Sequence, residues 1–294
     1  MALSGSLIER LSERLSRHLG RAVDVERAVP VGGGSINDGY RLHTNEGTFF
    51  AKTNRADHSP SMFEAEADGL HRLRATGTVR VPEVIAWGED HDDTFLLLEH
   101  IGSAPKGPMF WEDLGRSLAR LHAVTGEHFG LERDNYIGTL RQTNTRHGAW
   151  DAFFVQCRLE PQVRMARDRQ RLGMGDVLRF ERLYMRLADL FPRERPALLH
   201  GDLWSGNILS DERSAPVLID PAVYFGHRDM DLAMARLFGG FEAGFFHGYN
   251  DEFPLAPGWE ERVDLCNLYP LLVHVNLFGG GYAQQVAAVL RRFT

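Results

Sequence analysis

The loop at residues 200–207, with the sequence HGDLWSGN, constrains the fold of this chain most strongly because apolar strands flank it on both sides. Residues 197–199 are expected to form a short strand that enters the loop, and residues 208–219 a tight hairpin that follows it. A hairpin of this length would bring Asn207 and Asp220 side by side at its open end. A His-Gly-Asp triplet alone carries little information, since Asp and Gly favour turns whatever the function.

The spacing of three polar side chains gives this loop a chemical meaning. Asn207 lies five positions after Asp202, and Asp220 lies thirteen after Asn207. The spacing is similar to that of kinases, in which the loop Asp accepts a hydroxyl proton while the Asn and the later Asp bind Mg²⁺. Gly201 replaces the Arg of the protein kinase loop, and Asp220 opens Asp-Pro-Ala instead of Asp-Phe-Gly. Two such oxygen donors suit Mg²⁺, because this ion usually takes only a few ligands from the protein and the others from substrate phosphates.

A glycine-rich turn in the first fifty residues has two possible roles. Gly33, Gly34 and Ser35 lie between two predicted strands, and no Gly-Lys-Ser/Thr follows them, so the turn is not a Walker loop. The turn could simply connect a hairpin. It could also be a backbone lid over phosphates, and a following strand that ends in Lys52 favours this second role.

Lys52 needs a carboxylate partner, because it stands at the end of an apolar strand. Kinases pair such a lysine with a glutamate on the next helix, and the pair positions the nucleotide phosphates. The helix predicted from Ser61 onwards offers two candidates. Glu64 lies three residues after Ser61, which indicates a capping box that occupies this carboxylate locally. Glu66 shares the apolar face of the helix and is therefore the expected partner of Lys52.

The chain is expected to form two lobes with different secondary structure. Strands are predicted at 81–87 and 94–99, and the rise in polarity after them places the domain boundary between residues 101 and 102. A bilobal kinase binds adenine at this crossing through backbone groups, here those of Leu98, Glu99 and His100. From residue 111 onwards the apolar spacing predicts helices, over 114–122, 150–159, 177–190 and 262–272.

The segment after Asp220 limits the type of acceptor. Asp229 and Asp231 are expected to be structural, with Asp231 as the N-cap of a helix. Only eleven positions separate Asp220 from Asp231, which leaves little room for an activation segment or a platform for protein substrates. Pro221 has a locked φ angle and takes the position of the phenylalanine switch. These features favour a small-molecule kinase with an α+β, bilobal, protein kinase-like fold.

The overall composition is that of a soluble globular protein of 294 residues, with 43% hydrophobic and 25% charged residues. The net charge of −7 gives no electrostatic reason to expect a nucleic-acid partner. Cys157 and Cys266 have neither pairing nor metal-binding spacing, so we expect buried thiols in a reducing cytoplasm. No signal peptide or membrane span is expected, because no apolar segment is long enough.

The chain resembles the fructosamine (ketosamine) kinases, within the wider group of aminoglycoside and choline kinase-like enzymes. The loop carries Trp204, which other members of the wider group generally lack, and Ser35 stands where some family members have a cysteine, so we expect no redox control there. The matching segments span most of the chain: 32–37, 62–67, 135–138, 200–207, 220–222, 269–272 and 276–281, together with Trp150, Phe153 and Phe154.

The resemblance implies ATP-dependent phosphorylation of the C3 hydroxyl of a ketosamine, the adduct formed when an amine is glycated. It also implies a role in deglycation, because the phosphorylated adduct is unstable. In this interpretation Asp202 is the base, Asn207 and Asp220 hold Mg²⁺, and Lys52 with Glu66 positions the phosphates of ATP.

Three questions stay open on the sequence alone. Trp204 is expected either to line the acceptor pocket or to anchor the loop on the lower lobe. The acceptor could instead be an aminoglycoside or an amino alcohol, and a non-catalytic ATP-binding pseudokinase is the other alternative. The residues do not specify the preferred sugar or amine, or the oligomeric state.

Overall fold

The computed structural model describes residues 3–32, 37–55, 61–91 and 93–294. The chain forms two compact units, Met1–Gly107 with Leu209–Asp220, and Pro108–Ile208 with Pro221–Thr294. The expected division had the whole of 102–294 in one lobe. The units differ from it at the boundary and in the segment 209–220, which returns to the first unit.

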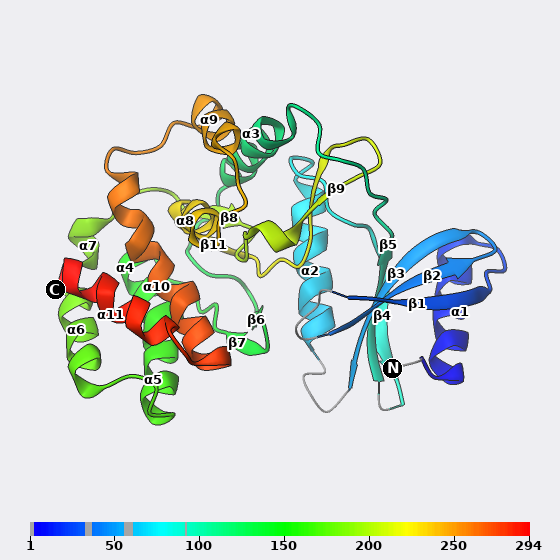
Figure 1. Ribbon diagram of the computed structural model, residues 1–294, viewed down its shortest axis with the longest axis horizontal. Helices are drawn as coiled ribbons and strands as arrows, with labels where there is room; N and C mark the ends of the chain where they lie inside the picture. The colour runs from blue at the N-terminus through cyan, green and yellow to red at the C-terminus, as the bar shows by residue number, and fades with distance from the viewer. Residues whose placement is uncertain (1–2, 33–36, 56–60, 92) are drawn as a thin grey trace. The chain divides into compact units, whose positions relative to one another are not determined.

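An antiparallel five-stranded sheet forms the centre of the first unit (Figure 1). Its strands run in the order β1-β2-β3-β5-β4, and the hydrogen-bonded neighbours are antiparallel throughout. Their bounds are β1 Val25–Val31, β2 Asp38–Thr44, β3 Gly47–Arg55, β4 Val84–Asp90 and β5 Asp93–Glu99. The strands predicted at 81–87 and 94–99 correspond to β4 and β5.

Two helices cover opposite faces of this sheet, α1 (Gly5–Leu19) and α2 (Met62–Ala75) (Figure 1). Helix α1 begins where the Ser4 side chain accepts a hydrogen bond from the Leu7 amide at 3.2 Å, and its buried leucines pack with Ala51 and Leu97. Because side chains alternate along a strand, the residue after Ala51 points to the face that α2 covers. That residue is Lys52.

The hairpin predicted after the loop is present and belongs to the first unit. Its strands are β9 (Ile208–Ser210) and β10 (Pro216–Leu218). Arg80 attaches it, because its guanidinium pairs with Glu99 at 2.9 Å and also with the buried carboxylate of Asp211. The Arg80 carbonyl also accepts a hydrogen bond from the Leu218 amide at 2.9 Å. The chain therefore crosses between the units twice here, after Ile208 and after Asp220.

The second unit is mostly helical. The long helix α10 packs against α5, α8 and α11, while α3 packs against α9. Two short strands, β8 and β11, pair beside the loop, and β6 pairs with β7. The helices are α3 Phe110–His122, α4 Trp150–Phe153, the π-turn η1 Phe154–Leu159, α5 Glu160–Asp168, α6 Met174–Tyr184, α7 Leu187–Leu190, the 3₁₀ turn η2 Ser205–Asn207, α8 Asp229–Leu237, α9 Ala243–Glu252, α10 Trp259–Phe278 and α11 Tyr282–Phe293. The strands are β6 Asn135–Ile137, β7 Leu140–Gln142, β8 Ala197–Leu199 and β11 Tyr224–Gly226.

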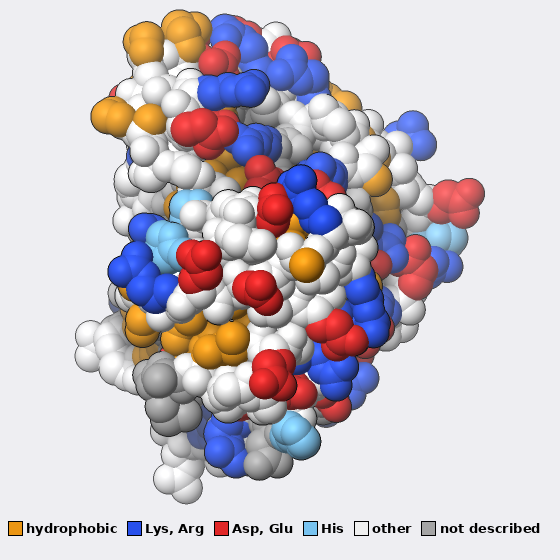
Figure 2. Space-filling model, turned by 90° about the vertical axis from the view of Figure 1, so that its right-hand side faces the viewer, with side chains coloured by type: hydrophobic (Ala, Val, Ile, Leu, Met, Phe, Trp, Pro, Cys, Tyr) orange, Lys and Arg blue, Asp and Glu red, His pale blue; other side chains and the backbone are white. Residues whose placement is uncertain are grey.

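The observed elements confirm the α+β class. No helix among the described residues is long and apolar enough to cross a membrane. On the face of the molecule shown in Figure 2, acidic and basic side chains are intermixed.

Candidate active site

Lys52 is the centre of the charged cluster in the first unit. It lies within β3, which continues to Arg55, so the prediction that the strand ends at Lys52 is wrong. Its ammonium lies 2.7 Å from Glu66 Oε1 and 2.5 Å from Asp220 Oδ1. The predicted Lys52–Glu66 ion pair is therefore present, and Asp220 joins it from a position 168 residues away.

Charge compensation keeps this buried lysine protonated. Burial alone would lower the pKa of the Lys52 ammonium, but the charges of Glu66 and Asp220, together with hydrogen bonds to both, raise it above its ordinary value. Burial raises the pKa of the Glu66 carboxyl, and the nearby Lys52 charge opposes this shift. The ion pair with Glu66 therefore holds the positive charge of Lys52 in place, and Asp220 is a second carboxylate in contact with it.

Glu66 is the partner of Lys52, as predicted, but the capping box expected to occupy Glu64 is absent. Ser61 precedes the first residue of α2 but has φ −93° and ψ 2°, and it makes no side-chain capping bond. The predicted capping box with Glu64 is therefore not formed. The helix-face argument alone identifies Glu66, which lies on the side of α2 that meets the sheet.

Asp220 has a backbone conformation that is uncommon outside glycine. Its φ is +56°, in the left-handed region that few non-glycine residues adopt. Such conformations concentrate at functional sites, where the surrounding structure imposes them. Here the hairpin β9–β10 on one side of Asp220 and the ion pair to Lys52 hold it in place.

The predicted adenine edge lies at the end of β5. Leu98 is buried, and Glu99 uses its carboxylate locally, to pair with Arg80 and to accept a hydrogen bond from the Glu83 amide at 3.1 Å. Burial lowers the pKa of the His100 imidazole, and the nearby charge of Arg41 adds to this effect. Gly33, Gly34 and Ser35, predicted as a phosphate lid, lie outside the described residues.

In the second unit, Asp202 and Asn207 form a closed turn. The Asn207 side-chain amide donates to the Asp202 carbonyl at 2.9 Å and to its carboxylate Oδ2 at 3.0 Å. Since the amide nitrogen faces Asp202, the amide oxygen is turned away and offers a ligand atom. The 3₁₀ turn Ser205–Asn207 between the two residues fixes their separation.

Gly201 explains why the loop has no arginine at this position. Its φ is +83°, and a Cβ atom there would lie 2.1 Å from the Ala222 carbonyl oxygen. Only glycine allows the loop to pass so close to the segment that follows Asp220. The Ala222 amide also donates to the His200 carbonyl at 2.9 Å, so this contact holds the two segments together.

Asp231 holds the backbone of the loop at residues 200–207, a role that the sequence did not reveal. Its carboxylate accepts hydrogen bonds from the backbone amides of His200 and Gly201, at 2.7 and 2.9 Å. The prediction that Asp231 caps a helix is wrong, because α8 begins two residues earlier with Arg228 in the N-cap position. Asp229 is structural as expected, since it pairs with Arg262 at 2.7 Å.

His122 completes this support. Its Nε2 lies 3.2 Å from Asp231 Oδ2, and its Nδ1 lies 2.8 Å from the Tyr249 hydroxyl. All three side chains are buried. A histidine on the same face as Leu114 and Leu118, in an otherwise apolar stripe, was the one signal in the sequence that could have indicated such a role.

Residues 221–223, which follow Asp220 where protein kinases have the phenylalanine switch, are held by neutral side chains. Gln142 donates to the Ala222 carbonyl at 3.1 Å, and Asn135 donates to the Val223 carbonyl at 2.8 Å. Tyr269 in turn donates to Gln142 Oε1 at 2.7 Å. With Pro221 locking φ, the backbone after Asp220 has no rotating side chain on which a switch could depend.

Trp204 lies over its own turn. Gly206 lies beneath the indole, so close that a Cβ there would clash with the ring at 2.2 Å. The indole also packs edge-on against Phe238, with ring centroids 6.4 Å apart, and 39% of Trp204 remains exposed.

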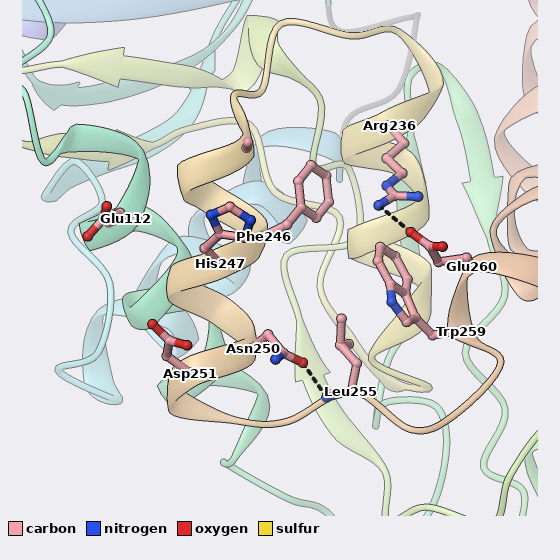
Figure 3. A pocket seen from close by; sticks show the side chains of 10 residues that line it. Glu112, Arg236, Phe246, His247, Asn250, Asp251, Leu255, Trp259 and Glu260 are labelled. Atoms are coloured by element: carbon pink, nitrogen blue, oxygen red, sulfur yellow. Dashed lines mark hydrogen bonds and ion pairs between the residues drawn. The ribbon is translucent and has the colours of Figure 1, made fainter.

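A large cavity of about 680 Å³ in the second unit does not belong to this site (Figure 3). It lies beside α9, where Arg236 stacks on Trp259 and pairs with Glu260. Among the residues that the structure describes, none of those predicted to belong to the active site lines this cavity.

These groups suit the transfer of a phosphoryl group, which needs positioning and charge neutralisation more than covalent catalysis. In kinases, a lysine–glutamate pair of this kind positions the nucleotide phosphates, and an aspartate followed by an asparagine handles the acceptor hydroxyl and the metal. The fold and the two groups of residues define a kinase of the protein kinase-like class.

Comparison with known proteins gives the family. The fructosamine kinase family model matches residues 7–294, so the chain belongs to this family. A "probable ketoamine kinase" of Enterococcus faecium is 41% identical over 269 residues, which cover 91% of this chain and 95% of that protein. The chloroplastic "protein-ribulosamine 3-kinase" of Arabidopsis thaliana is 39% identical, with 92% and 83% covered.

Solved structures agree with this assignment. The crystal structure of a "putative fructosamine-3-kinase" from Thermobifida fusca has a TM-score of 0.85 at 36% identity, with 95% of this chain and 96% of that one covered. An aminoglycoside phosphotransferase, APH(4)-Ia, has a TM-score of 0.62 at 16% identity, with 96% and 98% covered, and this likeness shows the fold alone. The protein is an ATP-dependent phosphotransferase that acts on a hydroxyl group.

Proposed function

We propose that this kinase transfers the γ-phosphoryl group of ATP to the C3 hydroxyl of a ketosamine. The names of its relatives, ketoamine kinase and ribulosamine 3-kinase, support this acceptor class. The phosphate placed at C3 is a better leaving group than a hydroxyl. Its elimination from the enamine form of the adduct leaves an imine, and hydrolysis of this imine by water releases the amine. The resulting cellular role is deglycation.

The turn formed by Asp202 and Asn207 carries the proposal. Asp202 accepts the proton of the acceptor hydroxyl, and the two hydrogen bonds from Asn207 hold its carboxylate in one orientation. A general base must lie within hydrogen-bonding reach of its proton, so this fixed geometry is part of catalysis. Asp231 and His122 act as positioning residues, because they hold the backbone of this loop.

Lys52 and Glu66 act on the nucleotide. The Lys52 ammonium is held between two carboxylates, and we assign to it the contact with the α- and β-phosphates. Gly33, Gly34 and Ser35 are assigned to the phosphate lid, and the backbone of Leu98, Glu99 and His100 to the adenine. Neighbours of the same fold crystallised with AMP or ADP support the use of a nucleotide.

Mg²⁺ would be held by Asn207 and Asp220. No group of three or more His, Cys, Asp or Glu side chains within the described ranges is placed to hold a metal ion. An ion held by one amide oxygen and one carboxylate, and otherwise by phosphates and water, fits this limited donor set. When bound, Mg²⁺ supplies charge neutralisation to the transferring phosphoryl group.

The proposed cellular location is the cytoplasm. Cys157 and Cys266 are both free and buried, as suits a protein of a reducing compartment.

A panel of acceptors tests the proposed function. The protein is incubated with Mg²⁺ and ATP and with fructosyl-lysine, ribulosyl-lysine or an aminoglycoside, and products are followed by ³¹P NMR. We expect a new phosphomonoester signal, coupled to the C3 proton, with at least one ketosamine. A signal with the aminoglycoside alone would favour the alternative acceptor class. Nucleotide binding without transfer to any acceptor would indicate a pseudokinase.

A further inference from the structure

We propose that a strip of aromatic rings in the second unit binds the amine substituent of the ketosamine and selects apolar or aromatic substituents. The strip consists of Trp204, Phe238, His274, Phe278 and Tyr282. This inference rests on the proposed function, because it assigns to that site a second specificity element beyond the sugar.

The rings form a continuous series of contacts. From Trp204 the next ring is Phe238, with centroids 6.4 Å apart, and Phe238 lies 4.8 Å from His274. His274 then contacts Phe278 at 5.4 Å and Tyr282 at 4.9 Å. The series therefore connects the catalytic loop to the end of α10 and the start of α11.

Three rings of this strip are exposed, and they belong to one series of ring contacts. Trp204 is 39% exposed, Phe238 38% and Phe278 60%. Single exposed apolar side chains need no explanation, but exposed rings that join into one patch mark binding sites. The patch begins two residues from the proposed base Asp202, so the acceptor is the occupant that we assign to it.

The strip is preformed by the backbone on both sides. Gly240 has φ +87° and lies so close to Ser205 that a Cβ would meet its side chain at 2.6 Å, so the loop after Phe238 packs directly on the catalytic turn. At the other end, Arg171 donates to the carbonyls of Val275 and Asn276, and the second of these bonds is 2.6 Å long. The backbone that carries the rings is thus held in place at both ends of the strip.

The chemistry of a ketosamine fits this placement. Its amine nitrogen is three bonds from C3, roughly 4 Å away, so a C3 hydroxyl on Asp202 leaves the nitrogen near the loop that carries Trp204. The nitrogen is protonated at neutral pH, and an indole is the preferred aromatic partner for a cation. Burial lowers the pKa of the His274 imidazole, so this ring of the strip is neutral and does not repel the protonated amine. The substituent then extends over Phe238, the next ring in the series.

The test compares two fructosamines that differ only in the amine, one made from phenethylamine and one from ethanolamine. The readout is the ratio of their kcat/KM values. Each ring contact is expected to contribute about three- to tenfold in favour of the phenethylamine adduct. Phe238→Ser should lower the ratio by this factor.

Met185→Ser serves as the matched control, since Met185 is 78% exposed and lies at the end of α6, outside the strip. It should leave the ratio unchanged, and melting temperatures should show that all variants fold. A wild-type ratio near one, or equal losses with both adducts in Phe238→Ser, would overturn the strip while leaving the kinase assignment intact. Failure of the wild-type protein to phosphorylate either adduct would overturn the proposed function itself.

Discussion

At the scale of single residues, the position of Lys52 depends on two carboxylates with different origins. Glu66 belongs to the helix that follows β3, so helix-face reasoning could identify it. Asp220 lies 168 residues after Lys52, and no local pattern indicates that it contacts the same ammonium. The sequence thus predicts the helical half of this cluster, whereas the tertiary fold determines the other half.

Glu66→Gln tests the contribution of this ion pair. Lys52 retains Asp220 as a partner, so we expect the protein to fold and to bind ATP less productively. A hydrogen bond between charged groups contributes about 1.5–3 kcal/mol, which corresponds to a loss of about ten- to hundredfold in kcat/KM for ATP.

The control for this change is Asp68→Asn on the same helix. Asp68 pairs with Arg72 at 2.8 Å on a more exposed face, where such pairs contribute at most about 0.5 kcal/mol. Steady-state kinetics at varied ATP should separate the two variants. Equal values for Glu66→Gln and the wild type would show that the pair has no part in nucleotide binding.

At the scale of elements, the loop is fixed by contacts that a linear pattern does not contain. The hairpin β9–β10 and the strand β8 were predictable, because apolar runs and turn residues indicate them locally. The support of the loop by Asp231 was not, because the same residue type also favours helix N-caps. Which role it takes depends on where the backbone of His200 and Gly201 lies.

Asp231→Asn tests this support through its pH dependence. Burial alone would raise the pKa of the Asp231 carboxyl, but His122 and the backbone amides lower it below its ordinary value. A carboxylate with a lowered folded-state pKa stabilises the protein above its unfolded pKa, about 4, and this contribution is lost as the pH falls through the lower folded value.

The expected result is a melting-temperature difference between the wild type and Asp231→Asn that stays constant from pH 8 to about pH 5.5 and shrinks below about pH 4. At neutral pH the variant should lose about 2–4 kcal/mol, because an amide nitrogen would face a backbone donor in a buried position. A difference that does not vary with pH would show that the charge of Asp231 is not what holds the loop.

At the scale of the whole molecule, the sequence indicates two lobes but not their chain composition. Residues 209–220 belong to the first unit, where Arg80 joins the hairpin to Glu99. A pairing between residues so far apart in the sequence leaves no periodic signal. Both cysteines, in contrast, lie in the second unit, where their burial follows from apolar surroundings that the sequence does show.

These thiols provide a test of packing in the second unit. Burial raises the pKa of Cys157 and Cys266, so neither is expected to react quickly with dithiobis(nitrobenzoic acid) in the native protein. Both should react once urea unfolds the second unit. Met185→Cys, at an exposed position, should react at once and calibrates the assay. Rapid reaction of a native thiol would contradict the packing described for this unit.

Asp202→Asn tests whether Asp202 is the base of a ketosamine kinase. ATP affinity is measured by calorimetry, and turnover is measured with the best ketosamine acceptor. Removal of a general base costs about 10²–10⁴ in rate. We expect a loss of this size with ATP affinity unchanged. Wild-type turnover in Asp202→Asn would contradict it.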